Sequence, residues 1–309
     1  MTTTLATFQE TAAWECALYA FLAEKERRSG SRRTVEGYSR MLQHFFGSVG
    51  KTPEQVTGQE VFAWAYGKGL SGKEPSSITI GARLACLSSF YRFLIRMEVV
   101  TSNPCERIQR PRISLSPPKG LSAEDIKRLL AVTPSTPSGL RDKAIILTLV
   151  LTGRRRAEVL GLRAGDLSRE NGSVFYSYRG KGGKRGRREL PRPAFESIEA
   201  GLAAHGKSLD RMQPDESLWP SSADAKTGVT SATFYGNLQR YFKAAGLPPA
   251  GVHVFRRSAA KLRRDVGESI ESVCQFLDHS SLAVTTVYLR RLEGQEDRAS
   301  AKVAEAIGV

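Results

Sequence analysis

The sequence LTGRRRAEVLGLRAGDL, residues 151–167, places three consecutive arginines between two apolar segments. An apolar helix is predicted to end at Gly153, because glycine most often occupies the position just after a helix C-terminus. A second helix is predicted from about Arg156, and its apolar side chains are spaced to face a core: Val159, Leu160 and Leu162. Arg154, Arg155 and Arg156 therefore fall at a sharp junction between two helices that both pack against the interior.

An arginine held at such a junction is suited to binding phosphate. A fixed guanidinium presents two parallel N–H groups that match two phosphate oxygens. Glu158 lies three residues after Arg155 on the same helical face, where it could orient that guanidinium. The simpler alternative is a solvated basic turn, common in DNA-binding proteins, and the junction alone does not decide between the two.

A glycine-rich basic segment follows, YRGKGGKRGRR at residues 178–188. It is predicted to contain the turn between two strands, since GSVFYSY before it is β-branched and aromatic and RRELPRP can return beside it. On such a turn Lys181 could reach into a minor groove towards one phosphate, whereas a mobile, nonspecific phosphate contact is the plainer interpretation. The rest of the second part of the chain is predicted to be mostly helical, including residues 121–130, 193–205 and 231–246.

Two segments near the end of the sequence contain histidine. In HVFRRSAAKLRR, which begins at His253, Arg256 follows one helical turn later and can face the same point. In LDHSSLAVTTVYL, His279 lies in a predicted turn and Tyr288 on the helix after it. Taken singly, His253 fits a surface or capping histidine and Tyr288 fits a packed core residue. The chemical alternative for Tyr288 is a phenol held where it can attack.

Four amphipathic helices are predicted in the first third of the chain. Their apolar side chains recur at helical spacing within residues 14–22, 35–46, 61–66 and 84–95. Thr7 with Glu10, and Thr57 with Glu60, have the spacing of capping boxes.

A proline-rich basic segment, RIQRPRISLSPPKG at residues 107–120, follows these helices and lacks acidic residues. It is predicted to be a linker suited to lie along a phosphate backbone. We therefore expect two domains, residues 1–112 and 113–309, with a C-terminal tail from about residue 292.

The composition favours a polyanionic partner. The 309 residues include 46 Lys and Arg against 31 Asp and Glu, a net charge of +15 and a pI near 9.9, as is common for proteins that bind nucleic acid. The four cysteines are scattered without metal-ligand spacing, so neither a zinc site nor a disulfide framework is expected. With no secretory signal and no long uncharged apolar run, we expect no membrane association and a cytoplasmic location.

Four segments, taken together and in order, resemble the tyrosine recombinase (phage integrase) family, which includes Xer-like and Cre-like enzymes. They are TGRRRAEVLGLRAGDL, RGKGGKRGRRELP, HVFRRS and LDHSSLAVTTVY. Each is weak to moderate alone, but the order and spacing are specific, and the resemblance covers nearly the whole chain. It implies a mainly α fold with a small β-sheet, in which an N-terminal four-helix core-binding (SAM-like) domain precedes a C-terminal mixed α/β catalytic domain.

The resemblance also implies a catalytic set of six residues. Two arginines would clamp the scissile phosphate, a lysine would protonate the departing 5′ oxygen, two histidines would hold the phosphate and assist proton transfer, and a tyrosine would attack. The matching residues, in this order, are Arg155 and Arg256, Lys181, His253 and His279, and Tyr288. A free phenol has a pKa of about 10, so the attack depends on the surrounding cations. Because one phosphoester replaces another, no metal, ATP or other cofactor is expected.

The family's activity would make the chain a site-specific DNA recombinase that integrates, excises or resolves dimers through a 3′-phosphotyrosyl intermediate. Its expected partners are double-stranded DNA with an inverted-repeat recombination site and further copies of itself in a synaptic homo-tetramer, where the tail would dock on a neighbouring copy. A catalytically silent, integrase-like DNA-binding accessory protein is the alternative from another class. A type IB topoisomerase or a telomere resolvase would use the same chemistry for a different outcome.

Three positions depart from the family's usual pattern. Arg154 stands in place of the leucine of TGLR, Arg257 in place of the histidine of LRHT, and Asp278 in place of the glycine of LGH. Arg257 is expected to contact backbone. Asp278 either places a carboxylate next to the phosphate site or hydrogen-bonds His279. None of the six chemical positions is lost, which favours an active enzyme.

Overall fold

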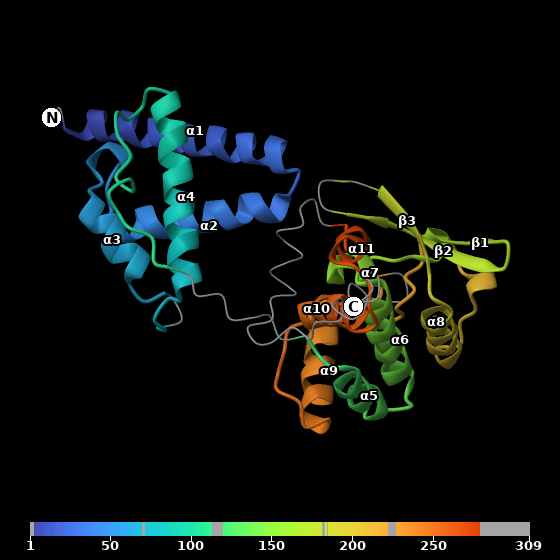
Figure 1. The fold of residues 1–309 in the computed structure, drawn as a ribbon. Coiled ribbons are helices and arrows are strands. Elements are labelled where there is room, and N and C mark those ends of the chain that lie inside the picture. Colours follow the sequence, from blue (N-terminus) through green and yellow to red (C-terminus); the bar gives the residue numbers. More distant parts are fainter. Residues whose placement is uncertain are drawn as a thin grey trace, which may run out of the picture. The chain divides into compact units, whose positions relative to one another are not determined.

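The chain divides into two compact units, residues 1–114 and 115–309 (Figure 1). The computed structural model describes residues 3–69, 72–112, 120–180, 183, 185–221 and 227–278, with side chains from residue 15 onward. Each unit has its own hydrophobic core. The boundary predicted from the sequence, between residues 112 and 113, differs from this division by two residues.

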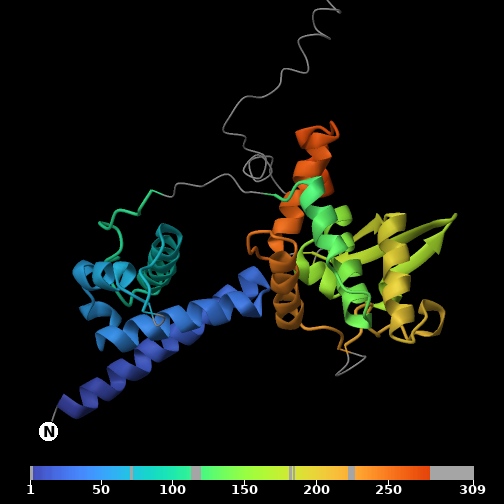
Figure 2. The same cartoon turned by 90° about the horizontal axis from the view of Figure 1, so that it is seen from below.

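Four helices form the N-terminal unit. They are α1 (Thr3–Ser29), α2 (Arg32–Val49), α3 (Gly58–Tyr66) and α4 (Ser77–Arg96), with a 3-10 turn η1 (Pro53–Gln55) before α3. α4 runs across α1 and α2 (Figures 1 and 2), and aromatic side chains from these helices meet edge to face: Phe21, Phe45, Phe46 and Phe90. The predicted capping role of Thr7 is wrong, because the preceding residues continue the helix back to Thr3.

The capping box predicted at Thr57 and Glu60 is confirmed. Thr57 and Glu60 form a capping box at the start of α3, and the Glu60 carboxylate accepts the Thr57 N–H at 2.9 Å. α2 ends at Gly50, whose φ of +62° favours glycine. Among the described helices, α4 is long and apolar enough by length and composition to cross a membrane. Its apolar side chains nevertheless form the centre of the bundle core: Leu84, Leu87, Phe90 and Leu94.

The C-terminal unit is mainly α with a small β-sheet, which confirms the predicted fold class. Its helices are α5 (Ala123–Ala131), α6 (Pro137–Thr152), α7 (Arg156–Leu160), α8 (Arg192–Ala204), α9 (Ser231–Ala244), α10 (His253–Asp265) and α11 (Ile270–Phe276), with 3-10 turns η2 (Ala164–Asp166) and η4 (Leu209–Arg211). α6 lies at the centre, between α8 on one side and α9 and α10 on the other (Figures 1 and 2). α6, the helix that leads into the arginine junction, is therefore packed on both sides.

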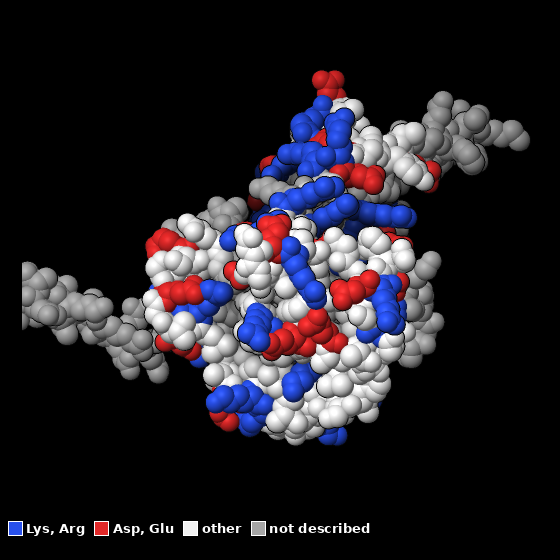
Figure 3. Space-filling model, turned by 90° about the vertical axis from the view of Figure 1, so that its right-hand side faces the viewer, with Lys and Arg blue, Asp and Glu red and all other residues white. Residues whose placement is uncertain are grey.

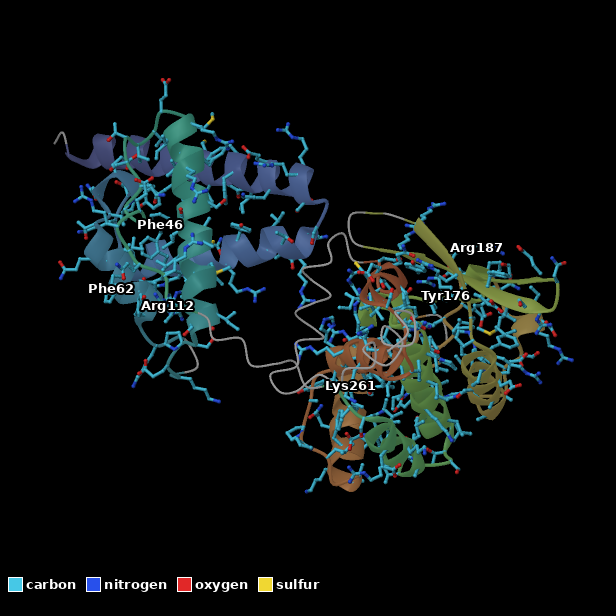
Figure 4. The ribbon with its side chains drawn as sticks, viewed as in Figure 1. Phe46, Phe62, Arg112, Tyr176, Arg187 and Lys261 are labelled. Carbon is cyan, nitrogen blue, oxygen red and sulfur yellow. The ribbon has the colours of Figure 1, made fainter. Side chains whose placement is uncertain are left out.

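Three antiparallel strands form the sheet in the order β1 (Leu167–Glu170), β2 (Ser173–Arg179) and β3 (Arg185–Glu189). The β2–β3 hairpin confirms the sequence prediction, and it pairs Tyr178 with Gly186. The sequence does not predict β1, because four residues with mostly exposed side chains carry no alternating pattern. Tyr176 on β2 is buried and lies between the sheet and the helices (Figure 4), so this face of the sheet closes the core.

The face formed by the sheet edge and α8 is not uniformly basic. Figure 3 shows basic and acidic side chains next to one another over much of it, and exposed ion pairs join Arg169 with Glu199 and Arg192 with Glu196. Such pairs add little stability, but each cancels a local charge. α7, α10 and α11 lie on the other side of the unit from β1 and α8 (Figures 1 and 2); α10 carries His253 and Arg256, and Arg155 directly precedes α7.

Candidate active site

The arginine junction has the geometry that the sequence predicts. α6 ends at Gly153, where φ is +62° and the N–H binds the carbonyl of Leu149 at 3.0 Å; α7 begins at Arg156. A Cβ atom at Gly153 would lie 2.5 Å from the ring of Phe276 and 2.8 Å from a methyl group of Leu277. Glycine is therefore required at position 153 for two reasons: the left-handed backbone conformation and the close approach of the end of α11.

Arg155 is held by Glu158, as expected from their spacing. The Glu158 carboxylate accepts the backbone N–H of Arg155 at 2.8 Å and its guanidinium Nη1 at 2.8 Å. The Glu158 side chain is 4% exposed and that of Arg155 36%. The guanidinium is thus fixed on its protein side and open to solvent on the other, as a ligand for an anion requires.

Arg256 is buried, at 2% exposed, and connects two segments. Its Nη1 donates to the carbonyl of Gly153 at 2.6 Å, and its Nη2 donates to the carbonyl of Leu277. Two of the five N–H donors of this guanidinium are thus directed at backbone carbonyls, which fixes its orientation. The expected second arginine therefore lies next to the arginine junction and also holds the end of α11 against it.

His253 is the first residue of α10, and its side chain is surrounded by positive charge. The pKa of His253 is lowered from its usual value, first because the protein partly withdraws the ring from water, then because of the charges of Arg256, Arg257 and Arg155. Arg155, His253 and Arg256 therefore come together, from two helices about 100 residues apart in sequence. Arg257 Nε is buried and has no hydrogen-bond partner among the described residues.

Arg154 points into the protein. It is 1% exposed, its Nη1 donates to the hydroxyl of Tyr178 at 2.7 Å and to the carboxylate of Asp278, and its Nη2 donates to the carbonyl of Phe276. Asp278 also accepts the hydroxyl of Tyr178 and, at 2.8 Å, Nη2 of Arg188. The side chains of Arg154 and Asp278, two departures from the family's usual pattern, are therefore in direct contact.

The sequence interpretation of Asp278 contains neither this partner nor the roles of Tyr178 and Arg188. The sequence did contain one signal for this contact. Both positions depart from the family's usual pattern, and the two residues that replace it, an arginine and an aspartate, have opposite charges. Lys181, His279 and Tyr288 lie outside the described residues. In the sequence Gly180 directly precedes Lys181, and Asp278 directly precedes His279.

A hollow of about 400 Å³ lies beside this cluster, lined by Thr152, Arg154, Tyr176, Arg188 and Phe276 among others. Three of its lining residues are arginines, Arg154, Arg188 and Arg263, and Arg263 lies over the ring of Phe276 at 3.5 Å from the ring centre. In the described part of the chain, no group of three or more His, Cys, Asp or Glu side chains could hold a metal ion.

The order of these segments matches a known family. The phage integrase family model matches residues 119–294, more than half of the chain. The chain belongs to the phage integrase family. This confirms the resemblance drawn from the four sequence segments.

Curated relatives of this family place the chain among the tyrosine recombinases. It is 30% identical over 209 residues to tyrosine recombinase XerC of Myxococcus xanthus, covering 67% of this chain and 69% of that one. It is 28% identical over 279 residues to tyrosine recombinase XerC of Roseiflexus castenholzii, covering 85% and 84%. The enzyme is therefore a tyrosine-type site-specific recombinase, and a catalytically silent accessory protein is not favoured.

A solved structure agrees with this fold. XerH recombinase bound to a palindromic difH substrate, in a post-cleavage complex, superposes with a TM-score of 0.64 at 20% identity. The superposition covers 89% of this chain and 79% of that one. At this identity the match concerns the fold, which has the same mainly helical architecture with a small sheet.

Proposed function

We propose that this recombinase cuts and rejoins DNA by attack of Tyr288 on a phosphate held by Arg155, Arg256, His253 and His279, with Lys181 as the general acid. The observation that carries the proposal is the convergence of Arg155, Arg256 and Arg257 on His253; burial first, and then the charges of these arginines, lower the pKa of that histidine. The charges of Arg155, Arg256 and Arg257 around this histidine favour an anionic ligand, and a DNA phosphate fits the overall charge of +15.

In the proposed reaction the phenolic oxygen of Tyr288 forms a bond to phosphorus, and the bond between phosphorus and the 5′ oxygen breaks. The departing oxygen takes a proton from Lys181, and the phenolic proton passes to a neutral base, for which His253 is suited by its lowered pKa. Arg155 and Arg256 balance the charge that builds on the nonbridging oxygens. The products are a 3′-phosphotyrosyl link and a free 5′ hydroxyl, and attack by a second 5′ hydroxyl reverses the step.

We further propose that the substrate is double-stranded DNA with an inverted-repeat site and that synapsis uses four copies of the chain in the cytoplasm. The N-terminal helical unit would contribute to binding the core site, and the C-terminal unit would carry the chemistry. The palindromic substrate of the XerH complex supports a repeat of this kind. Docking of residues 292–309 on a neighbouring copy belongs to the same proposal.

The test is covalent trapping on selected DNA. The purified chain would first select its best-binding duplexes from a pool of random sequence, and these would then be nicked near the candidate cleavage position so that the cut fragment diffuses away. The wild type should form an adduct that survives detergent, and Tyr288→Phe should bind the same duplex without forming it. A Phe variant that still forms the adduct would assign the nucleophile to another residue.

The same duplexes separate recombination from the related chemistries. Strand exchange that requires two copies of the site supports a recombinase. Relaxation of supercoiled DNA from a single site, or closure of a duplex end into a hairpin, would instead support a topoisomerase or a telomere resolvase.

A further inference from the structure

The carboxylate of Asp278 lies where three separate segments of the C-terminal unit meet. It binds Arg154 from the junction of α6 and α7, Tyr178 from β2 and Arg188 from β3. Arg188 Nη2 also binds the carbonyl of Gln275 at 3.1 Å. One side chain therefore joins the arginine junction, the hairpin that carries residue 181, and the turn after α11.

The geometry around this carboxylate is closely fitted. The ring of Tyr178 packs over Gly186, where a Cβ atom would lie within 2.4 Å of it, so the hydroxyl of Tyr178 is directed by the hairpin itself. The guanidinium of Arg154 lies 4.7 Å from the centre of the same ring. Asp278 has a φ of +50°, a left-handed conformation that is uncommon outside glycine but is tolerated by aspartate and asparagine.

The charges in this cluster depend on one another. Burial acts to raise the pKa of Asp278, but the hydrogen bond from Tyr178, the charge of Arg154 and the hydrogen bonds from Arg188 and Arg154 outweigh it, so the net pKa is lowered. Burial and the bond to Asp278 raise the pKa of Tyr178, which therefore keeps the proton it donates. Without Asp278, Arg154 would be a buried cation lacking its carboxylate, and without Arg154, Asp278 would keep only the half-exposed Arg188 as its cationic partner.

Arg256 makes a second connection between the arginine junction and the turn after α11. Arg256 binds the carbonyls of Gly153 and Leu277, and these residues directly precede Arg154 and Asp278 in the sequence. The arginine proposed to hold phosphate and the Arg154–Asp278 pair therefore connect the same two segments. A shift of the turn after α11 would move the acceptor that orients Arg256.

We propose that Arg154 and Asp278 are a mutually dependent pair of positioning residues that fixes the turn after α11 to the arginine junction and to the β2–β3 hairpin. The inference rests on the proposed function, since the groups being positioned are Arg155 and Arg256. Replacing the leucine and glycine of the family's usual pattern, the pair keeps the local charge neutral while adding a connection to the hairpin. Each residue is tolerated only in the presence of the other.

The experiment is a double-mutant cycle with Arg154→Leu, Asp278→Gly and the double variant, which restores the usual pattern of the family. Leucine removes the buried cation, and glycine accepts the positive φ without strain. The control is Arg169→Leu, the same change at an exposed arginine paired with Glu199. Three quantities are measured: the melting temperature, the affinity for the selected duplex, and the rate of covalent adduct formation at saturating protein.

Each single variant should form the adduct about tenfold more slowly than the wild type, with a DNA affinity within about twofold of the wild-type value. Residues in direct contact commonly show interaction energies large enough to produce an effect of this size. The double variant should recover to within about threefold of the wild-type rate, and Arg169→Leu should match the wild type. If Arg154→Leu does not fold, Asp278→Asn decides instead, because it keeps the shape and the backbone conformation but removes the charge.

Single variants that cleave at the wild-type rate would overturn the proposal, and so would a double variant whose loss equals the product of the two single losses. Both results presuppose a wild type that forms the adduct. A wild type that binds the selected duplex but forms no adduct would contradict the proposed function itself, so the two failures are distinguishable.

Discussion

Replacing Glu158 with glutamine should weaken both the fold of the C-terminal unit and its chemistry. The Glu158 carboxylate accepts two hydrogen bonds from Arg155, each 2.8 Å long, and is 4% exposed. Glutamine keeps the volume and one acceptor, but its amide N–H₂ group faces the guanidinium. A hydrogen bond to a charged group contributes about 1.5–3 kcal/mol. Because the Arg155 side chain is 36% exposed and partly screened, we expect a loss of about 1–2 kcal/mol.

For a unit of this size, that loss corresponds to a fall in melting temperature of roughly 2–8 °C. Adduct formation on the selected duplex should slow by roughly 10- to 100-fold, because a small displacement of a positioned group is costly in rate. DNA affinity should change little. Glu199→Gln, at the exposed pair with Arg169, is the control and should leave all three quantities unchanged. A Glu158→Gln variant that cleaves at the wild-type rate would refute the orienting role, whatever its melting temperature.

Three further predictions concern a glycine, a histidine and a lysine. Gly153→Ala should lower the melting temperature by clearly more than Gly172→Ala. Both glycines have positive φ, but only Gly153 lies against Phe276. Equal losses of melting temperature in the two variants would mean that α11 does not pack against Gly153. The pKa of His253 is lowered by burial and then by the charges of Arg256, Arg257 and Arg155, so its imidazole is neutral at pH 7 in the free protein. A bound phosphate should raise that pKa. DNA affinity should therefore rise as the pH falls from about 6.5, and His253→Gln should remove this dependence; identical slopes would contradict it. Lys181→Ala should not cleave normal DNA, but it should cleave a substrate with sulfur in place of the 5′ bridging oxygen. A thiol has a pKa of about 8.5, so the sulfur can leave as a thiolate without taking a proton. A variant that fails to cleave this substrate would exclude the general-acid role.

Local features of the sequence account for most of the fold. The helical spacing of apolar residues and the capping signals at Thr57 and Gly153 are short-range patterns, and the structure realises them at the predicted positions. The contact between Arg155 and Glu158 is also local, three residues apart on one helix. Such features are predictable because the backbone geometry of a helix alone brings the residues together.

The features that the sequence does not give are long-range. Arg154 and Asp278 are 124 residues apart, and no periodicity signals that the first of three adjacent arginines turns inward while the second faces solvent. That difference depends on where α11 packs against the junction. β1 is the exception, because it pairs with β2 across the two-residue turn Asn171–Gly172, in which both residues have positive φ, and an Asn-Gly pair is a local hairpin signal.

The most direct test of the central claim is to identify the residue that becomes attached to DNA. The adduct formed on the nicked selected duplex would be digested with protease and nuclease, and the modified peptide sequenced by mass spectrometry. The account predicts a single modified peptide, with a nucleotide joined through its 3′ phosphate to Tyr288. Attachment to any other residue, or through a 5′ phosphate, would contradict it.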